Sequence, residues 1–205
     1  MFLPVFASVL LLIAAIAVAN RHNSNLIQKR MDDFWERERA ANEVRRQSLD
    51  GLDYLSIPEP FFSLPRPEGD HRAEEAVRIL ENLRNEKIVN LGGMSNTDLK
   101  LKYGPANLNT LTACDLNYTS LVRALQMYAE ALAENDHEAE ATTLLEYSLD
   151  SGSDVSASYL LLAKLYLKAG DRSKAEALKE RAEGLNSLMK PSILRSLDRL
   201  LNGEE

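Results

Sequence analysis

The stretch VRALQMYAEALAENDHEAEA, residues 122–141, returns in altered form 34 residues later as SASYLLLAKLYLKAGDRSKA, residues 156–175. Small and apolar residues stand at matching places in the two copies. The matched pairs are Leu125 and Tyr159, Tyr128 and Leu162, Ala129 and Ala163, Leu132 and Tyr166, and Ala141 and Ala175. A period of this length is typical of helix-turn-helix repeats that stack on one another. The stretch therefore predicts an all-α fold of paired antiparallel helices.

The residue sizes suit such a stack. Ala129 and Ala163 leave room for paired helices to approach closely, and the larger Tyr and Leu side chains fill the grooves between them. Gly170 permits a tight turn, because glycine adopts positive φ without strain. Asp136 takes its place in the first copy, so we expect a turn there as well.

The second copy resembles the tetratricopeptide repeat family. The residues that carry the resemblance are Tyr159, Leu162, Ala163, Tyr166, Gly170, Ala175 and Ala182. The first copy departs from the family pattern, with Asp136 for the turn glycine and Ser148 for the last alanine. The resemblance covers residues 122–189 and implies two repeats.

The resemblance also implies a binding surface, because the first helices of such repeats form a concave face that holds an extended peptide or a partner helix. Mapped onto this sequence, that face consists of Arg123, Gln126, Glu130, Glu134, Lys164, Leu167 and Lys168. The mixed charges suit a polar segment of a protein partner. An ordinary solvated helix face is the alternative.

Further helices are expected on both sides of the repeats, giving a helical domain over residues 71–205. A helix over 71–86 has Asp70 as its N-cap, and Ser95 with Asp98 forms a capping box for a short helix. A long helix follows over 106–134. A final helix, with Pro191 in its first turn, caps the stack. Its apolar residues are Leu188, Ile193, Leu194, Leu197 and Leu201.

Residues 48–70 are expected to form a proline-rich linker, because their four prolines are incompatible with a helix interior. Phe61, Phe62 and Leu64 stand among these prolines. Clusters of aromatic side chains are usually buried against other parts of a protein and not left in solvent. We therefore expect this segment to dock on its own domain rather than on a partner.

Residues 2–19 carry no charge and predict a transmembrane anchor, since a helix of that length rises about 27 Å. Seven Lys or Arg follow between Arg21 and Arg46 and none precedes. The positive-inside rule then places the N-terminus outside and the C-terminal domain in the cytoplasm, in a single-pass cell-membrane protein. A cleaved signal peptide is the alternative, favoured by Ala17-Val18-Ala19 but lacking a positive n-region.

Residues 20–47 are expected to form a juxtamembrane helical stalk, because they contain no Gly or Pro and interspersed charges. Ile27, Met31, Phe34 and Ala41 fall near heptad spacing. They leave two alternatives: a short coiled coil that makes the chain a homo-oligomer, or a helix that folds back on its own domain or lies at the lipid surface.

Charge and motifs limit the function. Residues 48–205 carry 17 Lys or Arg against 26 Asp or Glu, which disfavours nucleic acid as a partner. The sequence has no nucleophile, metalloprotease or P-loop motif, so no enzyme activity, cofactor or metal is expected. Cys114 is expected to be a buried small hydrophobe. The turn at Gly92-Gly93 is expected to cap a helix rather than to bind an anion.

The whole chain also resembles a family of bacterial single-pass membrane proteins, through DFWERERAAN, LDYLSIP, NLGGMSNTDLKLKYG and SLMKPSILRSL. That family has no known activity, so the resemblance adds architecture only. The expected function is a membrane-anchored cytoplasmic adaptor or scaffold that binds a protein or peptide on its repeat-like helices. The alternative is a self-associating structural component of a bacterial envelope or division-type assembly.

Overall fold

The computed structural model describes the backbone of residues 3–203 and the side chains of residues 16–18 and 20–203. Within this range the regular structure is helical, with one isolated β-bridge between Leu55 and Ile88, which confirms the all-α fold class. The chain divides into two compact units. Unit 1 combines residues 1–48 with 95–108, and unit 2 combines residues 49–94 with 109–205.

Unit 1 contains α1 (Leu3–Glu43), α3 (Asn96–Tyr103) and the 3₁₀ turn η2 (Pro105–Asn107). Glu38 of α1 accepts a hydrogen bond of 2.8 Å from the Thr97 hydroxyl and forms an ion pair with Lys100. The expected capping box of α3 is confirmed, because Ser95 and Asp98 bond each other's backbone N–H. The stalk therefore packs its C-terminal end on α3.

The stalk helix ends at Glu43, four residues before the predicted boundary at residue 47. Backbone groups beyond the helix find partners elsewhere: the Gln47 N–H donates to the Tyr103 carbonyl, and the Asn107 amide donates to the Gln47 carbonyl. A Cβ at Gly104 would lie 2.7 Å from the Arg45 carbonyl oxygen, so only glycine allows this approach. These contacts join segments about 60 residues apart, which local sequence signals do not reveal.

Among the described residues, no helix has both the length and the apolar character needed to cross a membrane. The predicted anchor, residues 2–19, falls mostly on side chains outside the described part of the chain. The anchor therefore stays a prediction.

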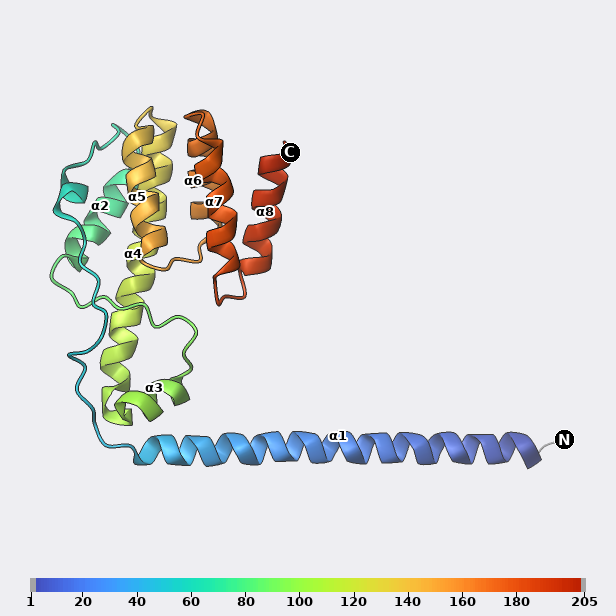
Figure 1. The fold of residues 1–205 in the computed structure, drawn as a ribbon. Helices are drawn as coiled ribbons and strands as arrows, with labels where there is room; N and C mark the ends of the chain where they lie inside the picture. The colour runs from blue at the N-terminus through green and yellow to red at the C-terminus, as the bar shows by residue number, and fades with distance from the viewer. Residues whose placement is uncertain (1–2, 204–205) are drawn as a thin grey trace. The chain divides into compact units, whose positions relative to one another are not determined.

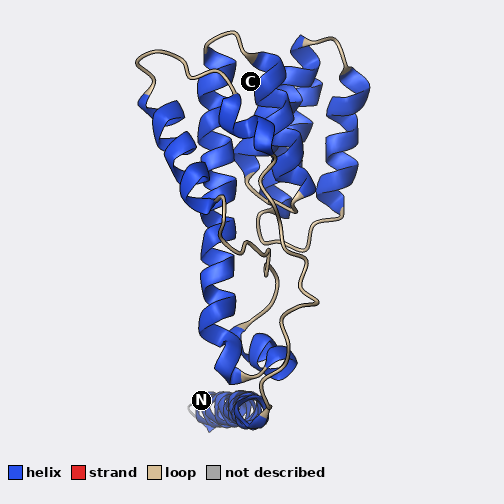
Figure 2. Ribbon diagram, turned by 90° about the vertical axis from the view of Figure 1, so that its left-hand side faces the viewer, coloured by secondary structure: helices blue, strands red, loops and turns tan. Residues whose placement is uncertain are grey.

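Unit 2 is a stack of helices that stand side by side (Figures 1 and 2). Next to one another along the stack lie the pair α4 and α5, the pair α6 and α7, and then α8 (Figure 1). The bounds are α2 His71–Leu83, α4 Leu108–Glu134, α5 Glu138–Asp150, α6 Ser156–Lys168, α7 Arg172–Glu183 and α8 Lys190–Asn202. A helical repeat-like architecture follows from this order.

The two helix pairs repeat the same local geometry with the offset of 34 residues. The His137 N–H donates to the Leu132 carbonyl at 2.9 Å, and the Asp171 N–H donates to the Tyr166 carbonyl at 2.8 Å. The turn residue has φ +63° at Asp136 and φ +79° at Gly170. All ten matched residues of the two copies are buried. The turn at Asp136 is thus confirmed.

The proline-rich segment docks on unit 2, as expected. Phe61 in the 3₁₀ turn η1 (Glu59–Ser63) is buried and meets Tyr147 edge-on, with ring centroids 5.2 Å apart. The Tyr128 hydroxyl donates to the Leu64 carbonyl at 3.0 Å, and Arg84 lies 4.0 Å above the Phe62 ring. The aromatic residues of the proline-rich segment are thereby covered by other parts of the same chain.

Helix α8 differs from the prediction at one residue. It begins at Lys190, with Pro191 in its first turn as predicted, and it buries Ile193 and Leu197. Leu188 was expected among its apolar residues, but it precedes the helix and is 98% exposed. The loop over residues 184–189 therefore presents a large apolar side chain to solvent.

Candidate partner-binding face and cavity

The predicted binding face comes from two helices. α4 supplies Arg123, Gln126, Glu130 and Glu134, and α6 supplies Lys164, Leu167 and Lys168. Spacings of three and four residues place side chains on one side of a helix. The contacts of these seven residues differ, and they decide which of them are free to meet a partner.

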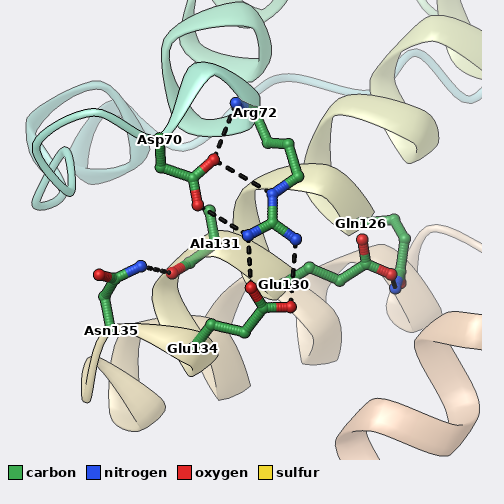
Figure 3. Close-up of polar contacts among 7 residues, drawn as sticks. All are labelled: Asp70, Arg72, Gln126, Glu130, Ala131, Glu134 and Asn135. Carbon is green, nitrogen blue, oxygen red and sulfur yellow. Dashed lines mark hydrogen bonds and ion pairs between the residues drawn. The ribbon is translucent and has the colours of Figure 1, made fainter.

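Gln126 is buried in the seam between α4 and α6. The Ser158 hydroxyl donates to its Oε1 at 2.5 Å, and its Nε2 donates to Glu130 Oε1 at 2.8 Å (Figure 3 shows the Gln126–Glu130 contact). A buried amide needs such partners, because an unpaired polar group in the core is costly. Gln126 therefore joins the two repeat copies instead of facing solvent.

Glu134 is paired within the chain. Arg72 of α2 reaches it through two hydrogen bonds, from Nη1 at 3.1 Å and from Nη2 at 2.5 Å (Figure 3). The same guanidinium also binds Asp70, the N-cap of α2, with Nε at 3.1 Å and Nη2 at 2.8 Å. Hydrogen bonds from Arg72 lower the pKa of both carboxyl groups. The Arg72 guanidinium group therefore links α2 to the C-terminal end of α4.

The α6 residues also differ in their freedom. Lys168 forms an ion pair with Glu138 of α5, which raises the pKa of its ammonium group, and Leu167 is half-buried against the core. Arg123 and Lys164 are exposed, and neither has an ion-pair partner among the described residues. Two free cations thus remain on the predicted face.

A separate cavity of about 730 Å³ opens at one end of unit 2. Its walls come from the turn at residues 90–93, α4, the turn between α5 and α6, and the loop at 184–189. The α5–α6 turn and the α7–α8 loop lie at the same end of their helices (Figure 1). The residues that matter most are Asn90, Asp115, Tyr118, Asp154, Leu188 and Met189.

Asn90 braces this cavity. Its Nδ2 donates to the Ser151 and Gly152 carbonyls at 3.1 and 3.3 Å, and its Oδ1 accepts from the Gly92 N–H at 2.9 Å. A Cβ at Gly152, which has φ +85°, would lie 2.7 Å from Nδ2. The two turns approach so closely because one residue of the second is glycine.

The charge of the cavity is negative. Asp115 Oδ1 accepts from the Leu91 N–H at 3.1 Å, and Asp154 Oδ2 accepts from the Ser187 hydroxyl. Of the described residues, no Lys, Arg or His lines the cavity. Each carboxylate keeps one oxygen that is not used in these bonds, so the site can accept hydrogen bonds from a cation.

Tyr118 lines the same cavity and is only 9% exposed. Its hydroxyl is buried without a hydrogen-bond partner among the described residues. Burial raises the pKa of this phenol to about 12. An unpaired buried hydroxyl is unfavourable by about 1–3 kcal/mol.

The sequence pointed to this cavity only indirectly. The Gly92-Gly93 pair stood out, and the structure places it in the wall as a turn. Asp115, Asp154 and Leu188 come from elements far apart in the chain, and no periodicity links them. Exposed polar residues flanking short loops were the only signal, and such residues are common.

One further expectation concerns Cys114. Cys114 is buried and free, as expected, and burial raises the pKa of its thiol. Among the described residues, no three His, Cys, Asp or Glu side chains gather in a way that would hold a metal ion.

Comparisons with protein-family models, with curated proteins and with solved structures give no match. The fold and the two surfaces define the chain as a helical repeat-like all-α protein.

Proposed function

We propose that this protein is a membrane-anchored cytoplasmic adaptor that binds a polar segment of a protein partner on the α4–α6 face. The observation that carries the proposal is the pair of helix hairpins with matching turns and matching buried residues. Such hairpins resemble tetratricopeptide repeats and leave their first helices open to a partner. The exposed, unpaired Arg123 and Lys164 supply charge for recognition.

The anchor would raise the effective affinity of the short α4–α6 face for its partner. Two repeats offer a small contact area, and a small interface binds weakly in isolation. Attachment through residues 2–19 would hold the domain at the membrane, where partners in the same membrane reach a high effective concentration. The charge asymmetry around that segment supports the cytoplasmic orientation.

Affinity capture of the full chain from membranes tests the face. The variant Arg123→Glu/Lys164→Glu reverses the two free cations without breaking an ion pair, and Arg199→Glu on α8 is the control on another surface. We expect the double variant to lose partners that both the wild type and Arg199→Glu retain. Partners captured equally by all three proteins would contradict the proposed face.

Thiol labelling tests the orientation. Ser24→Cys in a Cys114→Ser background places one thiol at an exposed position of α1. We expect a membrane-impermeant maleimide to label this thiol only after the cells are opened. Labelling in intact cells would place the domain on the other side of the membrane.

One observation favours self-association as a second function. Ile27, Met31 and Phe34 of α1 are 52%, 45% and 48% exposed and form one apolar stripe. A parallel pairing of two such helices would cover the stripe. Cross-linking in membranes should then yield dimers that Ile27→Asp/Phe34→Asp loses, and a wild type that stays monomeric would exclude this role.

A further inference from the structure

We infer that α1 pairs with α1 of a second copy of this chain as a parallel coiled coil in register. The seam of the pair is the stripe of Ile27, Met31 and Phe34, and it ends where α3 packs on α1. Beside the seam, Arg30 of each copy lies against Trp35 of the other. The inference rests on the self-association proposed above as a second function, and it adds the register, the extent and the flanking contacts.

The stripe has the spacing of a coiled-coil seam. Ile27, Met31 and Phe34 are separated by four and then three residues, which places them at successive d, a and d positions of a heptad. The series continues with Glu38 at the next a position and Ala41 at the next d position. The apolar part of the seam therefore lies on one line with residues whose packing the structure shows.

Helix α3 covers the continuation of this line. Ala41 is fully buried, and the Glu38 side chain is only 18% exposed because Thr97 and Lys100 of α3 bond it. In contrast, Ile27, Met31 and Phe34 are about half exposed. This side of α1 is thus the side that packs against another helix. A second copy would close the open part, and α3 would end the pairing beyond Phe34.

The flanking residues select a parallel pair. Arg30 and Arg37 take g positions and Trp35 takes an e position, and both Arg30 and Trp35 are exposed. In a parallel pair, a g residue faces the e residue of the next heptad on the other helix, so Arg30 meets Trp35. A guanidinium group above an indole ring is a favourable cation–π contact. An antiparallel pair would instead bring the g positions together and oppose arginine with arginine.

The continuity of α1 suits the same arrangement. The helix runs without a break from Leu3 to Glu43 and is straight in Figure 1. If residues 2–19 span a membrane, the seam continues away from the bilayer and does not lie along its surface. Two anchored copies would then point in the same direction. A seam of three residues is short, and attachment to one membrane raises the effective concentration at which the copies meet.

Disulfide cross-linking of the full chain in membranes tests the register. In a Cys114→Ser background, Ile27→Cys places a thiol on the seam. Leu26→Cys, at a neighbouring position that is similarly exposed (43% against 52%), is the matched control. After mild oxidation we expect several times more disulfide-linked dimer from Ile27→Cys, because d positions face each other and c positions point outward. Equal yields, or a higher yield from Leu26→Cys, would overturn the inference.

Sedimentation equilibrium of the full chain in density-matched detergent micelles tests the flanking contact. Arg30→Gln removes the cation from both sides of the pair, so the dissociation constant of the dimer should rise about fivefold or more. Lys29→Gln makes the same change of charge at an exposed f position, and it should leave the dissociation constant unchanged. The same effect of both variants would mean that only net charge matters and that Arg30 does not face Trp35.

Failure of this inference and failure of self-association give different results. A wild type that stays monomeric removes both. Dimers that Ile27→Asp/Phe34→Asp loses, but that show no preference for Ile27→Cys over Leu26→Cys, keep self-association and remove the parallel seam. A disulfide-linked product of Ile27→Cys that contains another protein would assign the seam to that protein and overturn the inference. The adaptor face is tested separately, because Arg123 and Lys164 lie outside α1.

Discussion

Individual glycines in unit 2 look alike in backbone angle but differ in what surrounds them. Gly152 and Gly170 have φ of +85° and +79°, so each permits a turn that other residues adopt with strain. Only Gly152 is also crowded, by the amide of Asn90. Sequence reasoning identifies Gly170 from its place in the repeat. It cannot see the crowding at Gly152, because Asn90 lies about 60 residues away.

Alanine at these two positions should therefore have different effects. Gly170→Ala should lower the free energy of unfolding by about 1 kcal/mol, the strain of a left-handed residue. Gly152→Ala should lower it by about 2–3 kcal/mol, since Asn90 must also shift and weaken its bonds to the Ser151 and Gly152 carbonyls. Urea denaturation of the full chain measures both. Equal losses would show that Asn90 is not a tight brace.

Two tyrosines of unit 2 offer a second contrast between residues. Tyr166 donates to Glu146 Oε1 at 2.7 Å, whereas the Tyr118 hydroxyl is buried and unpaired among the described residues. At neutral pH, Tyr118→Phe should leave stability unchanged or raise it by up to about 1 kcal/mol, and Tyr166→Phe should lower it by about 1 kcal/mol. Thermal unfolding of the two variants decides between these outcomes.

Tyr118 also predicts how stability depends on alkaline pH. Burial raises the pKa of Tyr118 to about 12, so the unfolded chain releases this proton first. The stability of the folded state that depends on a neutral Tyr118 is fully present below about pH 10, the ordinary tyrosine pKa. It is lost as the pH rises towards 12. Tyr118→Phe should flatten that decline, which denaturation between pH 9 and pH 12 would measure. An unchanged slope would mean that Tyr118 is not buried.

Elements fall into those that local patterns reveal and those that they do not. The helices α4 to α7 follow from a spacing of 34 residues, because each turn and each buried alanine lies close in sequence to the helices it joins. The packing of α3 on α1 follows from no such pattern. It depends on Glu38, Arg37 and Gly104, whose partners are remote in sequence.

A substitution in α1 tests that packing. Glu38→Gln removes the ion pair with Lys100, so the amide hydrogens of α3 should exchange faster with solvent. Glu36→Gln changes an exposed residue two positions earlier in α1. It is the matched control and should leave the exchange of the α3 amide hydrogens unchanged. Hydrogen bonds from Lys100 and Thr97 lower the pKa of Glu38, so its contribution is present at neutral pH and fades as the pH falls below 4.5. Protection of α3 that is the same in both variants would rule out this anchoring role.

At the scale of the whole molecule, unit 2 shares one hydrophobic core that runs from Phe61 through the repeats to Leu197. The position of α8 was predictable from its apolar spacing and from Pro191. The residue at which α8 begins was not, because Leu188 fits the same spacing but lies before the helix. A periodic pattern shows which face is apolar, and it does not show at which residue the helix begins.

Two leucines of the same predicted apolar pattern, Leu188 and Leu197, should thus behave in opposite ways. Leu197 is fully buried, and Leu197→Ala should lower the free energy of unfolding by about 2–4 kcal/mol through the cavity it leaves. Leu188→Ala should change it by less than about 0.5 kcal/mol. Because the core is continuous, Leu197→Ala should shift the unfolding of the whole unit. Circular dichroism and tyrosine fluorescence should then report the same midpoint of unfolding. Separate midpoints would mean that α8 unfolds on its own and that the core ends at α7.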